Sequence, residues 1–261
     1  MAEPQMSYED GAAYERYMGR WSRLVGETFL EWLEPGRGLR WADVGCGSGA
    51  LTELIVERCA PAAVEGVDLS EAQLAFARAR PAARLARFTR ADAMALPFPD
   101  ASFDAAVMAL VIFFVPEPAK AVAEMARVTA PGGLVATYAW DFLGGGFPLE
   151  PVRAGMRAMG LAPPAPPRVE ASRMEALQEL WRGAGLQALE TRQIEVARTF
   201  ADFEEFWSLS LLAASIRPAL AEMAPADVAK LEALVRERLS PRGGPLTCRA
   251  RANAIKGRVP G

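Results

Sequence analysis

The sequence predicts an α/β protein with a doubly wound, mainly parallel sheet at its core. Three observations support this fold class: strand and helix patterns alternate between residues 40 and 140, a glycine-rich turn follows the first strand, and an acidic residue ends the second. Such alternation builds parallel strands with right-handed crossovers. At 261 residues, 51% of them hydrophobic, the chain can bury one core of this kind.

Five strands are expected in the first part of the chain, at residues 39–44, 63–68, 84–90, 103–109 and 132–140. Helical spacing covers residues 50–59 and 119–129 between them. A further helix begins after the second strand, where Ser70 and Gln73 form a capping box. Each helix therefore connects two strands of one sheet.

The second part of the chain adds two strands and several helices. A proline-rich loop at 161–168 precedes a helix that is expected to begin at Ser172, with Glu175 completing a capping box, and to end near 183–185. Residues 187–199 and 246–256 have strand patterns, with helical patterns at 203–216 and 225–239 between them. Before the core, residues 8–33 are rich in aromatic side chains and end in an amphipathic helix.

Composition excludes several classes of function. The net charge is −3 without a run of basic residues, so we expect no nucleic-acid partner. The longest apolar run, 105–115, has about half the length of a membrane span, and the first ten residues do not resemble a secretory signal. Three widely spaced cysteines favour a reduced, cytoplasmic location and form no metal site. The absence of histidine excludes every imidazole-dependent mechanism.

The strongest local motif is the glycine-rich segment at 43–49, Asp-Val-Gly-Cys-Gly-Ser-Gly, between a strand and a helix. Glycines at Gly45 and Gly47 let the backbone turn tightly and approach a ligand closely. Asp68 ends the next strand, 21 residues beyond Gly47, where a carboxylate can accept hydrogen bonds from both ribose hydroxyls. The motif therefore predicts a nucleoside-containing ligand.

Two cofactor classes fit this motif. Gly45, Gly47 and Ala50 also match the dinucleotide fingerprint, so a nicotinamide-dependent oxidoreductase stays open. Asp43 favours S-adenosylmethionine, because a carboxylate there would repel a pyrophosphate and attract a sulfonium and an ammonium group. The structural alternative for Asp43 is a hydrogen-bond acceptor that braces the loop.

The motifs resemble those of the class I S-adenosylmethionine-dependent methyltransferases, specifically the type 11 group that includes the ubiquinone and menaquinone biosynthesis enzymes. The similar segments lie in family order at 43–49, 66–70, 90–98, 103–110 and 127–133. The resemblance implies a Rossmann-like sheet of seven strands whose last strand is antiparallel. It also implies one domain over 1–261, with a cofactor cover at about 1–35, a cofactor-binding core at about 36–142 and substrate-side helices at about 200–240, inserted before the last strand.

The resemblance also implies a cofactor site for S-adenosylmethionine, released as S-adenosylhomocysteine, with no metal. In it, Asp68 holds the ribose, Leu69 packs on the adenine and Asp92 meets its amino group; a solvated helix cap is the alternative for Asp92. The expected cofactor contacts are Trp21, Asp43, Gly45, Cys46, Gly47, Asp68, Leu69, Asp92, Ala93, Met108 and Ala109. The aromatic N-terminal segment would cover the adenosine, the alternative being a helix that simply packs on the sheet.

A small, apolar or aromatic acceptor is expected, methylated by in-line displacement at oxygen, nitrogen, carbon or sulfur. The wall predicted for it consists of Phe113, Phe114, Trp140, Phe142 and Trp207. Many relatives have a histidine where Phe113 and Phe114 stand, which leaves Tyr138, Asp141 and Tyr17 as candidate bases. A non-catalytic module that binds S-adenosylmethionine or S-adenosylhomocysteine is the main alternative function, since its cofactor motifs would be the same.

Overall fold

Residues 18–213, 215–239 and 243–261 are described by the structure, a computed structural model. Seven strands among them form one sheet in the order β3-β2-β1-β4-β5-β7-β6. Their bounds are β1 Arg40–Val44, β2 Ala63–Asp68, β3 Ala86–Arg90, β4 Phe103–Ala109, β5 Thr129–Trp140, β6 Gln187–Phe200 and β7 Leu246–Arg258. Pairs from β3 to β5 are parallel, and β7 is antiparallel to β5 and β6. The predicted seven-stranded sheet with an antiparallel last strand is confirmed.

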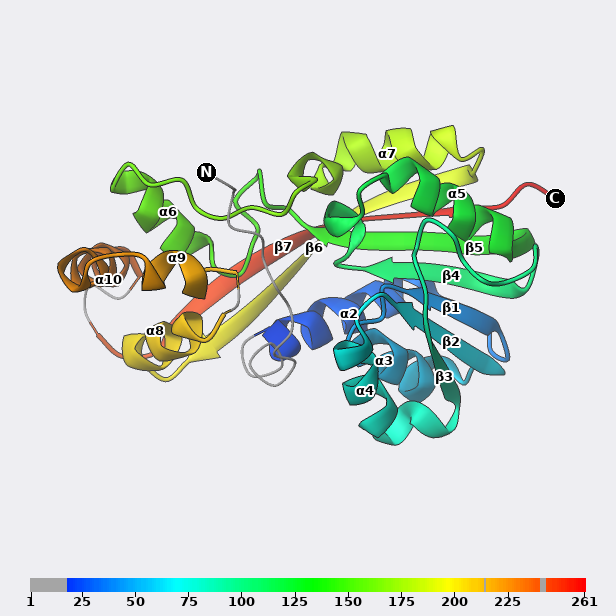
Figure 1. The fold of residues 1–261 in the computed structure, drawn as a ribbon, viewed down its shortest axis with the longest axis horizontal. Coiled ribbons are helices and arrows are strands. Elements are labelled where there is room, and N and C mark those ends of the chain that lie inside the picture. Colours follow the sequence, from blue (N-terminus) through cyan, green and yellow to red (C-terminus); the bar gives the residue numbers. More distant parts are fainter. Residues whose placement is uncertain (1–17, 214, 240–242) are drawn as a thin grey trace.

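Helices cover both faces of this sheet (Figure 1). On one face lie α2 (Arg20–Leu33), α3 (Ala50–Cys59) and α4 (Glu71–Ala79), and on the other α5 (Pro118–Val128) and α7 (Met174–Gly183). Short 3-10 helices follow at η2 (Pro81–Arg84), η3 (Ile112–Phe114) and η4 (Val169–Ser172). Because the strand order reverses between β1 and β4, a crevice opens at their carboxyl ends, where ligands bind in open parallel sheets.

Strands β6 and β7 extend beyond the sheet as an arm. β5 ends at Trp140 opposite Ala252, whereas the β6–β7 pairing continues to Phe200 and Leu246. The connection between them forms α8 (Phe203–Leu211), α9 (Arg217–Ala221) and α10 (Pro225–Leu239), and α6 (Glu150–Ala158) packs on α10. These four helices lie together beside the carboxyl ends of the core strands (Figure 1). The arm therefore brings a helical wall next to the crevice.

Helix α6 is absent from the sequence-based expectation. Gly155 weakens its local helix signal, whereas Pro151 lies in the first turn, where proline is tolerated; burial of Val152 and Met156 stabilises the helix. A Cβ at Gly155 would lie 2.7 Å from the Leu231 side chain, so glycine allows close packing on α10. Tertiary packing, rather than propensity, makes this helix.

Two predicted helix boundaries are wrong. The expected helix at 203–216 ends at Leu211 and is followed by the separate α9, which begins at Arg217 with Pro218 in its first turn. Ser172 belongs to η4, where its hydroxyl donates to the Val169 carbonyl at 2.7 Å. The predicted capping box with Glu175 is therefore not formed, and α7 begins at Met174.

Trp181 anchors α7 to the centre of the sheet. Its side chain is fully buried, and its indole N–H donates to the Val135 carbonyl of β5 at 3.1 Å. A Cβ at Gly257 would lie 3.0 Å from the Trp181 ring, so glycine on β7 leaves room for it. Within the described part of the chain, no helix is both long and apolar enough to cross a membrane.

Replacing Trp181 with alanine should lower the free energy of unfolding by about 3–5 kcal/mol, because it leaves a large cavity between α7 and the sheet. Denaturant unfolding followed by circular dichroism measures this loss. Glu179→Ala, an exposed change on the same helix, should cost less than about 0.5 kcal/mol. Equal effects of the two substitutions would show that α7 is not anchored as described.

Candidate active site

A cavity of about 520 Å³ lies at the carboxyl ends of β1, β2, β4 and β5. Its lining comes from the loops after these strands and after β3, from the start of α2 and from the α8–α9 connection. Three carboxylates, those of Asp43, Asp68 and Asp92, line it, and no lysine or arginine does so among the described residues. The cavity is therefore suited to a cationic ligand.

The loop between β1 and α3 forms the floor of the cavity. The amides of Gly45 and Cys46 both donate to the Val67 carbonyl, at 2.7 and 2.9 Å, which ties the loop to the end of β2. Gly45 has φ +73°, and a Cβ there would lie 2.6 Å from the Val111 side chain. Gly47 also has positive φ, but no atom lies within 4 Å of its Cβ position. Gly45 is thus required by packing, while Gly47 leaves open space beside the cavity.

Asp43 is the one acid of the site with no exposed surface. Its Oδ2 accepts a hydrogen bond from the Thr52 hydroxyl at 2.6 Å, and its buried Oδ1 has no hydrogen-bond partner among the described residues. Desolvation raises the pKa of this carboxyl to about 6; the Thr52 hydrogen bond opposes the shift and the charge of Asp68 adds to it. An unsatisfied buried carboxylate oxygen is costly, so this atom indicates a place for a donor, preferably a cation.

Asp68 and Asp92 are held by the backbone of neighbouring turns. Asp68 accepts from the amides of Gly47, at 2.9 Å, and Ser70, at 2.8 Å, one on each oxygen. Asp92 accepts from the Met94 amide at 2.8 Å in a turn, so it caps no helix. Both carboxylates keep further acceptor capacity toward the cavity. Between them, Leu69 exposes 59% of its surface and also lines the cavity.

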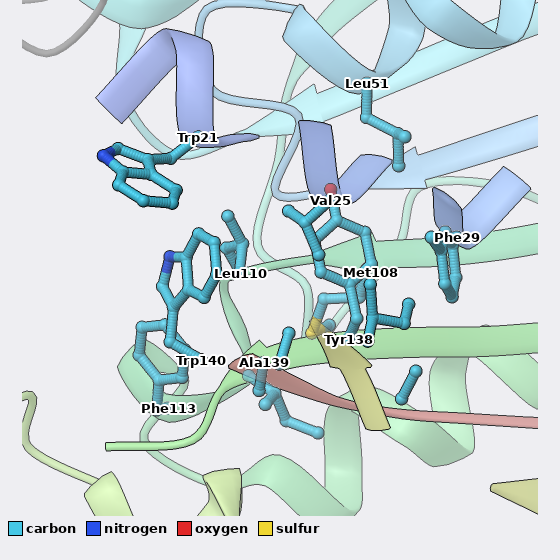
Figure 2. Close-up of a cluster of buried hydrophobic side chains, with 14 of the residues drawn as sticks. Trp21, Val25, Phe29, Leu51, Met108, Leu110, Phe113, Tyr138, Ala139 and Trp140 are labelled. Atoms are coloured by element: carbon cyan, nitrogen blue, oxygen red, sulfur yellow. The ribbon is translucent and has the colours of Figure 1, made fainter. Parts of the chain in front are cut away.

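The start of α2 contributes different residues from those expected. Met18 and Ser22, four residues apart on one helix face, line the cavity. Trp21 does not; it is fully buried in the core above Val25 and Leu110 (Figure 2). The helical period places Trp21 on the face that packs against the sheet. Tyr17 and the preceding aromatic residues lie outside the described part of the chain.

An aromatic wall closes the other end of the cavity. Its members are Phe113, Phe114, Trp140, Phe142 and, not predicted from the sequence, Phe147. The rings of Phe142 and Phe147 stack at 4.4 Å between centroids. The only sequence signal for Phe147 as a wall residue is that it and Phe142 flank the Leu-Gly-Gly-Gly turn.

Trp207 and Met108 do not line this cavity. Trp207 is buried within the arm and stacks on Phe203 at 6.0 Å. The chain after α8 contributes Ala213 and Ser215 instead, for which no local signal exists. Met108 is fully buried in the core near Tyr138 (Figure 2), whereas its neighbour Ala109 lines the cavity. Alternation along β4 explains this difference.

The two described candidate bases have structural contacts. Tyr138 borders the cavity, but its ring packs on Phe29 at 4.6 Å and its hydroxyl lies 3.4 Å from the Cβ position of Gly26 on α2. Asp141 does not line the cavity; its Oδ2 accepts from Arg251 Nη2 and Nε at 2.7 and 3.0 Å. Its Oδ1 accepts from the Gly144 amide. This Asp141–Arg251 pair holds the glycine-rich loop of the wall against β7.

Comparison with known proteins supports the interpretation of the core. Residues 42–137 match a family model described as a methyltransferase domain. The demethylmenaquinone methyltransferase of Thermus thermophilus is 41% identical over 116 residues, which are 44% of this chain and 51% of that protein. The chain thus spans about half the length of this curated relative.

Solved structures share the whole fold at low identity. The phosphoethanolamine N-methyltransferase 2 of Haemonchus contortus, in complex with S-adenosyl-L-methionine, has a TM-score of 0.58 at 19% identity, covering 96% of this chain and 56% of that one. The [4+2]-cyclase SpnF has a TM-score of 0.59 at 21% identity, covering 100% and 99%. The fold therefore hosts more than one kind of chemistry.

Asp141→Ala should lower the free energy of unfolding by about 1–3 kcal/mol, because it leaves the partly buried Arg251 without its carboxylate. The matched control is Asp100→Ala, which removes an exposed carboxylate from Arg127 and should cost less than about 1 kcal/mol. Chemical denaturation of both variants measures the difference. An unchanged stability of Asp141→Ala would contradict the clamp.

Proposed function

We propose that this chain, whose residues 42–137 match a methyltransferase domain model, transfers the methyl group of S-adenosylmethionine to a small, largely apolar molecule. The observation that carries the proposal is the buried Asp43, whose Oδ1 has no partner beside the open turn at Gly47. A cation with N–H donors satisfies this oxygen, and the ammonium of a methionine moiety is such a group.

The remaining acids suit the other parts of the cofactor. Asp68 has acceptor capacity for the ribose hydroxyls, and the exposed Leu69 offers an apolar surface for the adenine. Asp92 and Ala93 suit the adenine edge, and Ala109 lies at the end of β4 for the sulfonium. Met18 and Ser22, rather than Trp21, are proposed as the cover.

For methyl transfer, the main task of the protein is to align the acceptor with the methyl group of the cofactor. The bound cofactor supplies an activated methyl carbon, to which the acceptor's electron pair bonds as the carbon–sulfur pair moves to the sulfur. The aromatic wall positions the acceptor and excludes water. Since the chain has no histidine, no imidazole takes up a proton that the acceptor loses.

Two alternatives differ from this proposal in what they bind or turn over. A nicotinamide dinucleotide would place its pyrophosphate near Asp43, and no lysine or arginine among the described lining residues would neutralise it. A non-catalytic module, or an enzyme of another class on the same fold, would bind the cofactor without releasing S-adenosylhomocysteine.

Calorimetric titration tests the cofactor site. We expect micromolar binding of S-adenosylmethionine and S-adenosylhomocysteine, no binding of NAD, and an affinity about tenfold to a hundredfold weaker in Asp68→Ala, because charge-assisted hydrogen bonds are lost. Asp104→Ala is the matched control, since this carboxylate pairs with Arg40 at the opposite end of β4. NAD binding, or affinity indifferent to Asp68, would contradict the site. Release of S-adenosylhomocysteine in an acceptor screen separates the enzyme from a binding module.

The affinity for S-adenosylmethionine should rise with pH up to about 6 and then level off. Below that pH, Asp43 must lose its proton to bind a cation, and each unit below the pKa weakens binding by up to about tenfold. Titrations between pH 5 and 8 measure this dependence. Asp43→Asn should bind more weakly above pH 6 and show a flat profile; an unchanged profile would place the titrating group elsewhere.

The unliganded protein should show the opposite trend. The folded pKa of Asp43 is raised, so the protonated acid is favoured in the folded state. The stability present at acidic pH is therefore lost progressively as pH rises from about 4, the unfolded value, to about 6. In Asp43→Asn this contribution to the pH dependence should disappear.

A further inference from the structure

Two side chains of α5, Glu124 and Arg127, bind the segment that connects β3 to β4. Arg127 donates from Nη2 to the Leu96 carbonyl at 3.0 Å and from Nη1 to the Phe98 carbonyl at 2.8 Å. Glu124 Oε2 accepts from the Leu96 amide at 2.8 Å. The N–H and the C=O of Leu96 are thus both held by side chains, as a neighbouring strand would hold them.

The guanidinium of Arg127 is fully engaged. Its Nε and Nη2 donate to the two oxygens of Glu124 at 2.7 and 2.8 Å, and its Nη1 also donates to Asp100 at 2.7 Å. Together with the two backbone carbonyls, these acceptors use all five N–H donors of an arginine. The Arg127 hydrogen bonds lower the pKa of the Glu124 carboxyl, which keeps the pair charged at neutral pH. Such a forked pair fixes the direction of its bonds.

A short turn connects Leu96 to the cavity. The Ala95 amide donates to the Asp92 carbonyl at 3.0 Å, and the Met94 amide donates to the Asp92 carboxylate at 2.8 Å. Leu96 itself is buried, with 4% of its surface exposed, whereas Asp92 is half-buried and lines the cavity. The position of the Asp92 carboxylate therefore depends on where Leu96 is fixed.

The pair itself does not border the cavity. Helix α5 lies on the face of the sheet opposite α3 and α4 (Figure 1), and neither Glu124 nor Arg127 is among the lining residues. An effect of the pair on the geometry of a bound ligand therefore passes through the turn at 92–96. This separates a positioning role from direct binding.

We propose that Glu124 and Arg127 are positioning residues that make the site selective for adenine over hypoxanthine, because they hold Asp92 at the base edge of the cofactor. The inference rests on the proposed function, in which Asp92 meets the adenine edge. An ionised carboxylate only accepts hydrogen bonds, so it favours the amino group of adenine and disfavours the carbonyl that hypoxanthine has at the same ring position. Hydrogen bonds weaken steeply as their angle worsens, so this selectivity requires a fixed carboxylate.

A displaced Asp92 leaves the other parts of the cofactor site in place. Asp68 is held by the amides of Gly47 and Ser70, and Leu69 lies next to it in the chain. Loss of the α5 pair should therefore reduce selectivity between the two bases more than it reduces affinity for the cofactor. A general loss of folding would not produce that split.

The test compares S-adenosylhomocysteine with S-inosylhomocysteine, in which a ring carbonyl replaces the amino group. Calorimetric titration of the full chain gives both Kd values. We expect the wild type to prefer S-adenosylhomocysteine by about tenfold to a hundredfold. Arg127→Met and Glu124→Met should each reduce this preference by about threefold to tenfold. Arg127→Lys should behave like Arg127→Met, because lysine lacks the forked donors. The double Met variant should lose little more than either single one, because both side chains act through Leu96.

Two control variants separate positioning from a general loss of stability. Asp100→Ala removes only an exposed carboxylate from Arg127 and leaves both carbonyl hydrogen bonds, so the preference should stay unchanged. Arg40→Met removes another forked arginine, which binds Asp104 through Nε and Nη2 at the start of β1, and should also leave the preference unchanged. Denaturant unfolding of every variant establishes that the titrated protein is folded.

Hydrogen exchange measured by NMR tests the hold on the turn without any cofactor. The Leu96 amide should exchange about tenfold faster in Glu124→Met than in the wild type, because its acceptor is removed. In Arg127→Met, the Met94 amide that Asp92 binds should also exchange faster. Both control variants should keep the wild-type rates.

A base preference that survives in both Met variants would overturn the inference, as would unchanged exchange at residues 94–96. Equal binding of the two nucleosides by the wild type would overturn it as well, since Asp92 would then not distinguish the bases. Absence of S-adenosylhomocysteine binding to the wild type would overturn the proposed function and the selectivity with it, while the exchange rates still decide whether the pair holds the turn. Reduced preference in both Met variants, with unchanged controls, would support the inference.

Discussion

Asp43 is buried at the end of the central strand, with one oxygen bonded to Thr52 and the other unpaired. Keeping a carboxylate there costs free energy that the surrounding sheet must supply, and the raised pKa of the group reflects that cost. The turn that follows this acid depends on its glycines. A Cβ at Gly45 would collide with the Val111 side chain, and Gly47 leaves open space beside the cavity. The same turn holds Asp68, whose carboxylate accepts a hydrogen bond from the Gly47 amide.

The cavity joins two parts of the fold with different chemistry. At the carboxyl ends of β1 and β2, and just beyond β3, it is acidic, which suits a cationic nucleoside. At the end of β5 it is aromatic and uncharged, and there the wall depends on the Asp141–Arg251 pair and on the arm formed by β6 and β7. The part of the chain that matches the methyltransferase domain model supplies the first part, whereas the second part combines residues that follow β4 and β5 with Ala213 and Ser215 of the arm.

Local signals explain why the core could be predicted from the sequence. Short apolar strands, a glycine turn and the Ser70 cap act over a few residues, and α3, β2 and β4 have the predicted bounds. Helix α6 could not be predicted, because it depends on packing against α10, which is distant in the chain. Ser172 and Glu175 match the sequence pattern of a capping box. In the structure, however, the Ser172 hydroxyl donates a hydrogen bond to the Val169 carbonyl within η4.

The sequence by itself determined the sheet, the acidic residues at the strand ends and the class of cofactor they suit, because these depend on residue type and short spacing. Only the tertiary structure decided which side chains border the cavity. Helix periodicity turns Met18 and Ser22 toward it and Trp21 away, and the arm presents Ser215 rather than Trp207. Such orientation is set by long-range packing, in which each large ring is buried wherever the neighbouring elements leave space.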